Sequence, residues 1–166
     1  MRDNRGITLV ETIIALTIFL LVVTSVMVVY TNGYSSYILN NQRIEVQENL
    51  RIALNRMSRD IRQASEYITI YEQDENLSTD GSGPKIKFKN ASGVVVEYSY
   101  DPSGKEVEVR KGTGGSPLPL ASHIVGLEFQ YDQGKKIVTI LIQGQKASTN
   151  PPVVYELSTR VRARAL

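Results

Sequence analysis

The chain has 166 residues, a formal net charge of +2 and 22% charged residues, so its composition shows no strong bias toward nucleic acid or acidic ligands. It contains no cysteine, which excludes a disulfide, a zinc–thiolate site and a thiol nucleophile. The length suits one modest globular domain beside an apolar N-terminal segment.

That segment follows a short polar leader, Met1 to Gly6, and runs from Ile7 to Tyr30. As a helix of roughly 24 residues it spans about 36 Å, enough to cross a bilayer core of about 30 Å with some tilt. Its serine and threonine hydroxyls are compatible with this, because they can bond to preceding helical carbonyls. The sequence therefore predicts a membrane-spanning helix.

Glu11 is the one charged side chain in this apolar segment. A carboxylate inside a spanning helix costs on the order of 3 kcal/mol near the centre and less near an end, so a partner is expected. A cut between Gly6 and Ile7 would create an α-amino group one helical turn from Glu11. In a packed array of such helices, Glu11 of one copy would face the Ile7 ammonium of its neighbour, a pair worth on the order of 4 kcal/mol at about 4 Å and an effective dielectric near 20.

Gly6, Ile7 and Glu11, followed by the unbroken apolar run, resemble the cleavage and methylation motif of type IV pilins and type II secretion pseudopilins. The resemblance implies removal of the leader after Gly6 and N-methylation at Ile7 by a prepilin peptidase/N-methyltransferase. It further implies assembly with other pilins or pseudopilins through the N-terminal helix, on a platform driven by a cytoplasmic ATPase. The implied protein is structural rather than an enzyme, with no cofactor.

The type of subunit is predicted from two weaker features. Major pilins often carry a kinking proline in the second half of the apolar segment, where this chain has Val28. The stretch 51–67 resembles the helix of J-type minor pseudopilins and related minor pilins. Both features favour a minor subunit that helps to initiate or cap a filament.

The basic leader also predicts the location of the chain. Arg2 and Arg5 favour a cytoplasmic N-terminus, with the rest of the chain outside the cytoplasm. The resemblance to pilins implies that the membrane is the bacterial inner membrane and that the C-terminal domain later lies in a surface or periplasmic filament. A cleaved secretory signal has a shorter apolar region and a small-x-small cleavage site, neither of which fits here. A plain signal anchor explains the length but not Glu11.

Beyond Tyr30 the sequence becomes polar, yet a helical stripe of apolar residues continues. Its members recur at spacings of four and three: Val46, Leu50, Ala53, Met57, Ile61, Ala64 and Ile68. We therefore expect one helix from Ile7 to about Tyr71, with its first half in lipid or a filament core and its second half covering a sheet. The expected organisation is a leader over 1–6, a transmembrane or filament-core helix over 7–30, an amphipathic continuation over 31–71 and a β-sheet head over 72–166.

The head shows the alternation and turn residues of antiparallel strands. We expect five or six strands, with candidates at 85–89, 94–100, 106–111, 124–132, 135–143 and 153–163. The predicted fold is α+β, a pilin-like lollipop with a long N-terminal helix packed on one antiparallel sheet.

Other candidate sites in the head are weak. Asp74, Asn76 and Asp80 place oxygen ligands at alternate positions, but Thr79 and Lys85 occupy the places where a calcium-binding EF-hand needs glycine and glutamate. A solvated turn is favoured over a metal site. His123, the single histidine, has no partner nearby in sequence, and no nucleophile-elbow pattern supports a hydrolase.

Basic residues alternate along two predicted strands, as in Lys85, Lys87 and Lys89. Such a pattern is typical of a solvated outer face, and it is also what a DNA-binding face needs. We favour the solvated face. The alternative function is a binding module for DNA or a secreted substrate at a filament tip.

Overall fold

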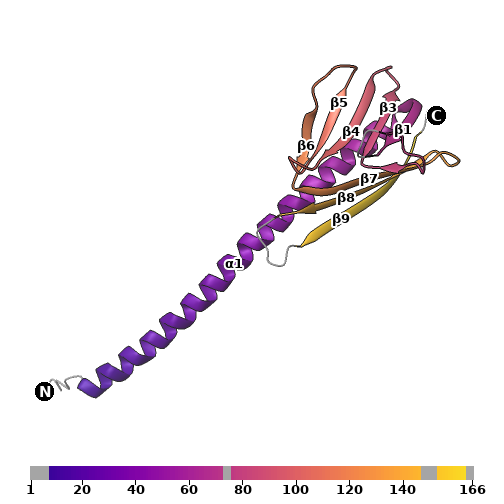
Figure 1. Ribbon diagram of the computed structural model, residues 1–166. Coiled ribbons are helices and arrows are strands. Elements are labelled where there is room, and N and C mark those ends of the chain that lie inside the picture. Colours follow the sequence, from indigo (N-terminus) through magenta and orange to yellow (C-terminus); the bar gives the residue numbers. More distant parts are fainter. Residues whose placement is uncertain (1–7, 73–75, 147–152, 164–166) are drawn as a thin grey trace. The chain divides into compact units, whose positions relative to one another are not determined.

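The computed structural model describes residues 8–72, 76–146 and 153–163 (Figure 1). The chain divides into two compact units, with the boundary between Asn41 and Gln42. One long helix, α1, runs from Leu9 to Arg62, and nine strands follow it among the described residues. This confirms the predicted pilin-like α+β fold, in which a long N-terminal helix packs against antiparallel sheet.

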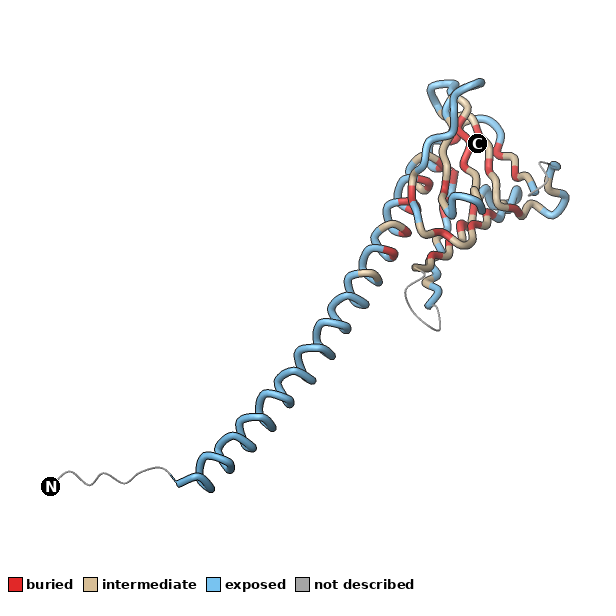
Figure 2. Tube along the Cα trace, turned by 60° about the vertical axis from the view of Figure 1, so that its left-hand side comes forward, coloured by how far each residue is buried: buried red, intermediate tan, exposed pale blue. Residues whose placement is uncertain are grey.

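Within the first unit, the described residues of α1 are exposed along its whole length, as the pale blue tube in Figure 2 shows. Within the second unit, α1 buries one face, formed by Val46, Leu50, Ala53, Leu54, Met57 and Ile61. These positions lie three or four residues apart, apart from the adjacent pair at 53 and 54, so they lie on one side of a helix. The predicted apolar stripe is confirmed over this range.

The predicted end of the helix near Tyr71 is wrong. α1 ends at Arg62, and strand β1 occupies Ala64–Tyr71. Ala64 and Ile68 are buried as predicted, but from a strand. The segment from Ile68 to Tyr71 reads Ile-Thr-Ile-Tyr, and β-branched and aromatic residues favour a strand where a neighbouring strand is available. Strand β3 supplies that neighbour.

The head contains two antiparallel sheets rather than one. The five-stranded sheet has the order β1-β3-β4-β5-β6, with β3 at Lys85–Asn90, β4 at Val95–Asp101, β5 at Glu106–Lys111 and β6 at Leu118–Ser122. The four-stranded sheet has the order β2-β7-β8-β9, with β2 at Ser82–Gly83, β7 at Ile124–Asp132, β8 at Ile137–Gln145 and β9 at Val154–Arg162. The prediction of five or six strands is therefore too low, because β1, β2 and β6 were not expected.

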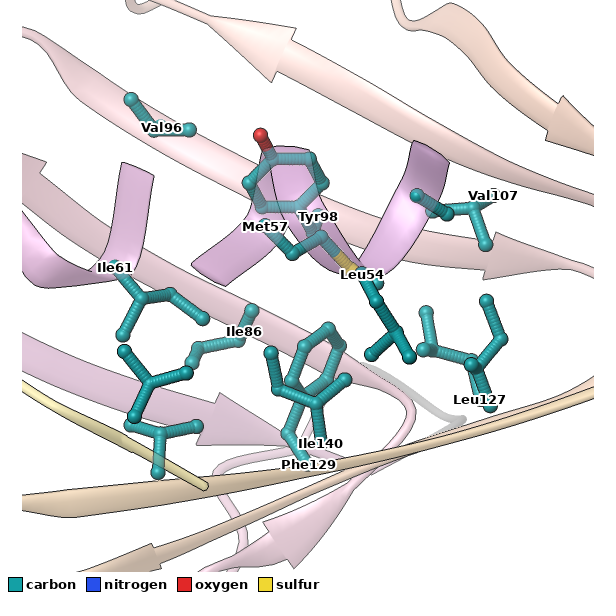
Figure 3. Packing of buried hydrophobic residues seen from close by; sticks show 14 of the residues in the cluster. Leu54, Met57, Ile61, Ile86, Val96, Tyr98, Val107, Leu127, Phe129 and Ile140 are labelled. Atoms are coloured by element: carbon teal, nitrogen blue, oxygen red, sulfur yellow. The ribbon is translucent and has the colours of Figure 1, made fainter. Parts of the chain in front are cut away.

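The core of the head draws on α1 and on both sheets (Figure 3). Met57 of α1, Phe88 and Tyr98 of the five-stranded sheet, and Phe129 and Ile140 of the four-stranded sheet are each 0% exposed. At Gly144 of β8 an added Cβ would lie 2.9 Å from Val46 and 3.0 Å from Leu50. A glycine near the end of β8 thus lets the strand approach the helix closely.

The buried Tyr98 carries its polar hydroxyl to the helix. This hydroxyl donates a hydrogen bond to Asp60 Oδ2 at 2.8 Å, and Arg56 Nε and Lys111 Nζ lie 3.5 Å and 3.6 Å from the same oxygen. Burial, together with the hydrogen bond to Asp60, raises the pKa of Tyr98 well above its ordinary value. The contact joins β4 to α1 inside the head.

We expect Tyr98→Phe to lower the free energy of unfolding by about 2 kcal/mol, because it removes one hydrogen bond to a charged group. Since the folded state holds the phenol proton, the wild-type head keeps this contribution below the ordinary tyrosine pKa of about 10 and loses it as pH rises above that value. Tyr98→Phe should abolish this alkaline loss. Urea unfolding at neutral and alkaline pH measures both effects, with Tyr67→Phe as a control at a half-exposed tyrosine. Equal alkaline loss in Tyr98→Phe and wild type would contradict this assignment.

Candidate functional site

The start of α1 is capped by Thr8. Its hydroxyl oxygen accepts a hydrogen bond from the backbone N–H of Glu11 at 3.2 Å, and its carbonyl accepts the N–H of Thr12 at 3.1 Å. Thr8 and Glu11 thus occupy the two positions of a capping box, Thr-x-x-Glu. A carboxylate in the first helical turn also interacts favourably with the helix dipole. Sequence reasoning explained Glu11 only through a partner subunit and missed this local role, which the spacing itself signals.

The three residues predicted to carry processing and assembly are only partly placed. Glu11 is described and exposed in the first turn of α1. Gly6 and Ile7 lie outside the described residues. The cleavage and methylation assignments therefore remain predictions based on sequence.

After Glu11 the helix presents an apolar surface. Every large hydrophobic residue that the structure describes from Leu9 to Val29 is at least 37% exposed. α1 is long and apolar enough in this region to cross a membrane, and none of its most apolar window is buried. Soluble monomers rarely expose large contiguous apolar patches, so this run of exposed apolar side chains marks contact with lipid or with other apolar helices.

The hydroxyl groups of this segment are bonded within the helix. Thr17, Thr24 and Ser25 each donate to the carbonyl four residues earlier, at 2.8, 2.7 and 2.8 Å. Thr12 makes the same kind of bond to Thr8 at 3.2 Å. This confirms that the hydroxyls do not prevent burial of the segment in an apolar environment.

The weak calcium candidate, formed by Asp74, Asn76 and Asp80, lies only in part within the described residues. Asp74 lies outside them. Asn76 accepts the backbone N–H of Glu72 through its carbonyl at 2.9 Å, and Asp80 accepts bonds from the Ser78 hydroxyl at 2.8 Å and the Ser82 N–H at 2.9 Å. The hydrogen bond from Ser78, followed in importance by that from Ser82, lowers the pKa of the Asp80 carboxyl. Asp80 therefore serves to close the turn.

The structure brings together a different group of acids. Carboxylate oxygens of Asp101, Glu106 and Glu108 lie within 4.8 Å of one another near the β4–β5 turn. Sequence reasoning missed this group, because the residues come from two strands whose pairing sets Asp101 opposite Glu106. Exposed acids are often this close without an ion, so the geometry alone does not assign a metal site.

His123 has a structural environment. It adopts a φ of 64°, and its Nε2 lies 3.6 Å from Glu45 Oε1 on α1. Glu45 also accepts a hydrogen bond from Lys146, which together with the charges of Lys146 and His123 lowers the pKa of its carboxyl. The neighbouring Ser122 is the acceptor of a long 3.4 Å contact from Asn49 Nδ2. Among the described residues, nothing here resembles a nucleophile–base pair.

The lysine face of β3 is paired with acids. Lys85 Nζ and Lys87 Nζ lie 3.4 Å and 4.0 Å from the buried Glu97 carboxylate, and Arg110 lies 3.4 Å from it. Lys89 Nζ contacts Glu66 at 2.8 Å, which raises the pKa of Lys89. The cations on this face are therefore partly neutralised by their own neighbours.

Comparison with known proteins adds one decisive finding at the N-terminus. Residues 1–27 match the family model described as the prokaryotic N-terminal methylation motif. The chain carries the N-terminal methylation motif of type IV pilins and pseudopilins. No curated protein matches the chain at the level of significance required.

From Leu9 onward, the residues that match the motif lie in the exposed apolar part of α1. The motif implies processing by a prepilin peptidase, and together with the apolar helix it indicates a pilin-like protein anchored in the inner membrane. Proteins of the pilin family are structural and not enzymes, in line with the prediction from sequence.

Proposed function

We propose that the chain is a minor pilin or pseudopilin that helps to initiate or cap a type IV pilus or type II secretion pseudopilus. The observation that carries the proposal is the methylation motif over residues 1–27, continued by a helix whose apolar side chains are exposed. The resemblance of the stretch 51–67 to minor pseudopilins and the absence of a proline before Pro84 support the minor assignment.

In this proposal the leader 1–6 is removed after Gly6, and Ile7 becomes the methylated N-terminus. The segment 7–30 first spans the inner membrane, with the N-terminus in the cytoplasm and the head outside. It then contacts other pilins in the filament core, after transfer by an assembly platform with a cytoplasmic ATPase. Glu11 pairs with the Ile7 amine of a neighbouring subunit.

Mass spectrometry of the chain purified from its native membrane tests the proposal directly. We expect the first residue to be Ile7, with a methylated amino group. A mature chain that keeps Met1, or begins at any other residue, would overturn both the cleavage site and the role of the new amine.

Gly6→Val should leave the leader attached, because the peptidase is expected to require a small residue before the cut. Processing should fall to background, measured as the ratio of full-length to shortened chain in the membrane fraction. Asn4→Val is the matched control, because it introduces the same side chain into the leader away from the cut. Normal shortening of the Gly6→Val variant would count against this cleavage site.

A tip-binding module for DNA or a secreted substrate is the second candidate. The pairing of Lys85, Lys87 and Lys89 with Glu97 and Glu66 argues against a free basic face at β3. Binding of the protein to double-stranded DNA that weakens steeply with salt would favour this candidate.

A further inference from the structure

The edge strands of the two sheets differ in how well they are protected against pairing with a further strand. β2 is two residues long, and β6 contains Pro119 and pairs with β5 through a shifted register. The loop after β1 folds back on its outer edge, where Leu77 bridges Tyr71 and the Ser78 N–H donates to the Ile70 carbonyl at 3.0 Å. Short length, proline, irregular register and covering loops are four of the usual means of stopping a further strand from adding to an edge.

Among the described residues, β9 shows none of these four protections, although it carries the charged side chains of Glu156, Arg160 and Arg162 on one face. It runs for nine residues, Val154–Arg162, without proline, and pairs with β8 in one continuous register from Val154 opposite Gln145 to Arg162 opposite Ile137. Among the described strands, β8 is its one neighbour in the sheet (Figure 1). An edge of this length presents a row of backbone donors and acceptors to a further strand.

Side chains alternate along β9 in a way that suits a further strand. Tyr155 and Leu157 pack on the core but remain half-buried, so an added strand would cover them further. The charged residues Glu156, Arg160 and Arg162 are exposed on the other face. Gln143 Nε2 donates to Glu156 Oε2 at 2.8 Å and holds this carboxylate in place, while Arg162 makes no ion pair with any described residue.

The strand is complementary to itself when a second copy is laid antiparallel with Thr159 on the two-fold axis. Glu156 of each copy then stands opposite Arg162 of the other, and Leu157 stands opposite Val161 on the core face. Because of the two-fold axis, each pair occurs twice. Opposite charges and apolar pairs directly across two antiparallel strands are both stabilising.

We propose that β9 is a pairing edge at which a second copy of the chain adds its own β9, joining the two four-stranded sheets into one continuous sheet. This contact lies in the head and uses none of the residues of the N-terminal motif. A chain that fails to pair through β9 can therefore still have its leader removed, and failure of this proposal can be told apart from failure of the proposed function.

The test uses the full chain, solubilised in detergent, with one introduced cysteine. The natural chain has none, so the introduced thiol is the sole one. In the proposed register the two copies of position 159 have Cα atoms about 4.5–5.5 Å apart, within the range of a disulfide. Thr159→Cys should therefore cross-link to a dimer under mild oxidation.

Val154→Cys is the matched control on the same strand. The side chain is more exposed, at 49%, but its two copies would be offset by about ten residues, or roughly 33 Å. We expect at least about a tenfold lower cross-linked fraction for Val154→Cys, since cross-linking there requires a different encounter. Equal fractions for the two variants, or no dimer from a folded Thr159→Cys chain, would overturn the proposal.

A charge exchange in the Thr159→Cys background provides a second measurement. Glu156→Arg should weaken self-association roughly tenfold, because two attractive cross-strand pairs become repulsive, and adding Arg162→Glu should restore it. Thermal unfolding of each variant reports whether the head is folded. If the exchange does not restore dimer in folded protein, the register centred on Thr159 is wrong.

Discussion

Glu11→Leu is expected to insert into the inner membrane as well as the wild-type chain but to be nearly absent from filaments. The substitution removes a charge from an apolar segment, so insertion becomes easier. In the filament it removes the proposed partner of the Ile7 amine, an interaction on the order of 4 kcal/mol. Loss of half of that energy corresponds to a decrease of roughly thirtyfold in incorporation at equilibrium. Quantitative immunoblots of membrane and sheared-filament fractions measure the two effects.

Three further variants separate charge from helix capping. Glu11→Gln keeps the length of the side chain and the backbone N–H that donates to Thr8, so it tests the charge alone. Thr8→Val removes the capping hydroxyl, at a cost of about 1 kcal/mol, and leaves the charge. Thr17→Val removes a hydroxyl that bonds to Ile13 further along the same helix and serves as the control. If Glu11→Gln enters filaments as well as the wild-type chain while Thr8→Val does not, the cap at Thr8 rather than the charge of Glu11 supports assembly, and the inter-subunit pair is wrong.

The N-terminal half of the chain was predictable from sequence because its signals are local. One short segment contains all of these signals, namely the long apolar run and the spacing of Gly6, Ile7 and Glu11. The methylation motif matches this segment. The buried face of α1 from Val46 to Ile61 was likewise predictable, because the recurrence of apolar residues every three or four positions identifies it. The cap at Thr8 was equally visible in the spacing of Thr8 and Glu11.

The head was less predictable because its missing strands depend on distant partners. Residues 64–71 continue the helical spacing of apolar residues at Ala64 and Ile68, and their strand conformation follows from pairing with β3. β6 lies in a stretch rich in glycine and proline and is formed by pairing with β5. In contrast, β5 and β7 have clear alternation, and the predicted bounds of both agree with the structure.

The chain crosses from one sheet to the other at Gly83, whose close approach to β1 has no strong sequence signal. Gly83 ends β2 in the four-stranded sheet, and after Pro84 the chain enters β3 of the five-stranded sheet. A Cβ added at Gly83 would lie 2.2 Å from the carbonyl oxygen of Tyr71 and 2.9 Å from its carbonyl carbon. The two backbones thus approach more closely than any side chain allows.

Gly83→Ala is expected to destabilise the head by at least about 3 kcal/mol, since the added methyl group meets backbone atoms of β1 that cannot move without disturbing its pairing with β3. Urea unfolding, followed by a spectroscopic signal of the head, measures this change. Gly134→Ala in the turn between β7 and β8 is the control: its Cβ would meet one side-chain oxygen, of Asp132, at an ordinary 3.4 Å. Near-wild-type stability of Gly83→Ala would mean that β1 and β2 can separate without loss of the core, and that the two sheets are joined through α1 rather than through this crossing.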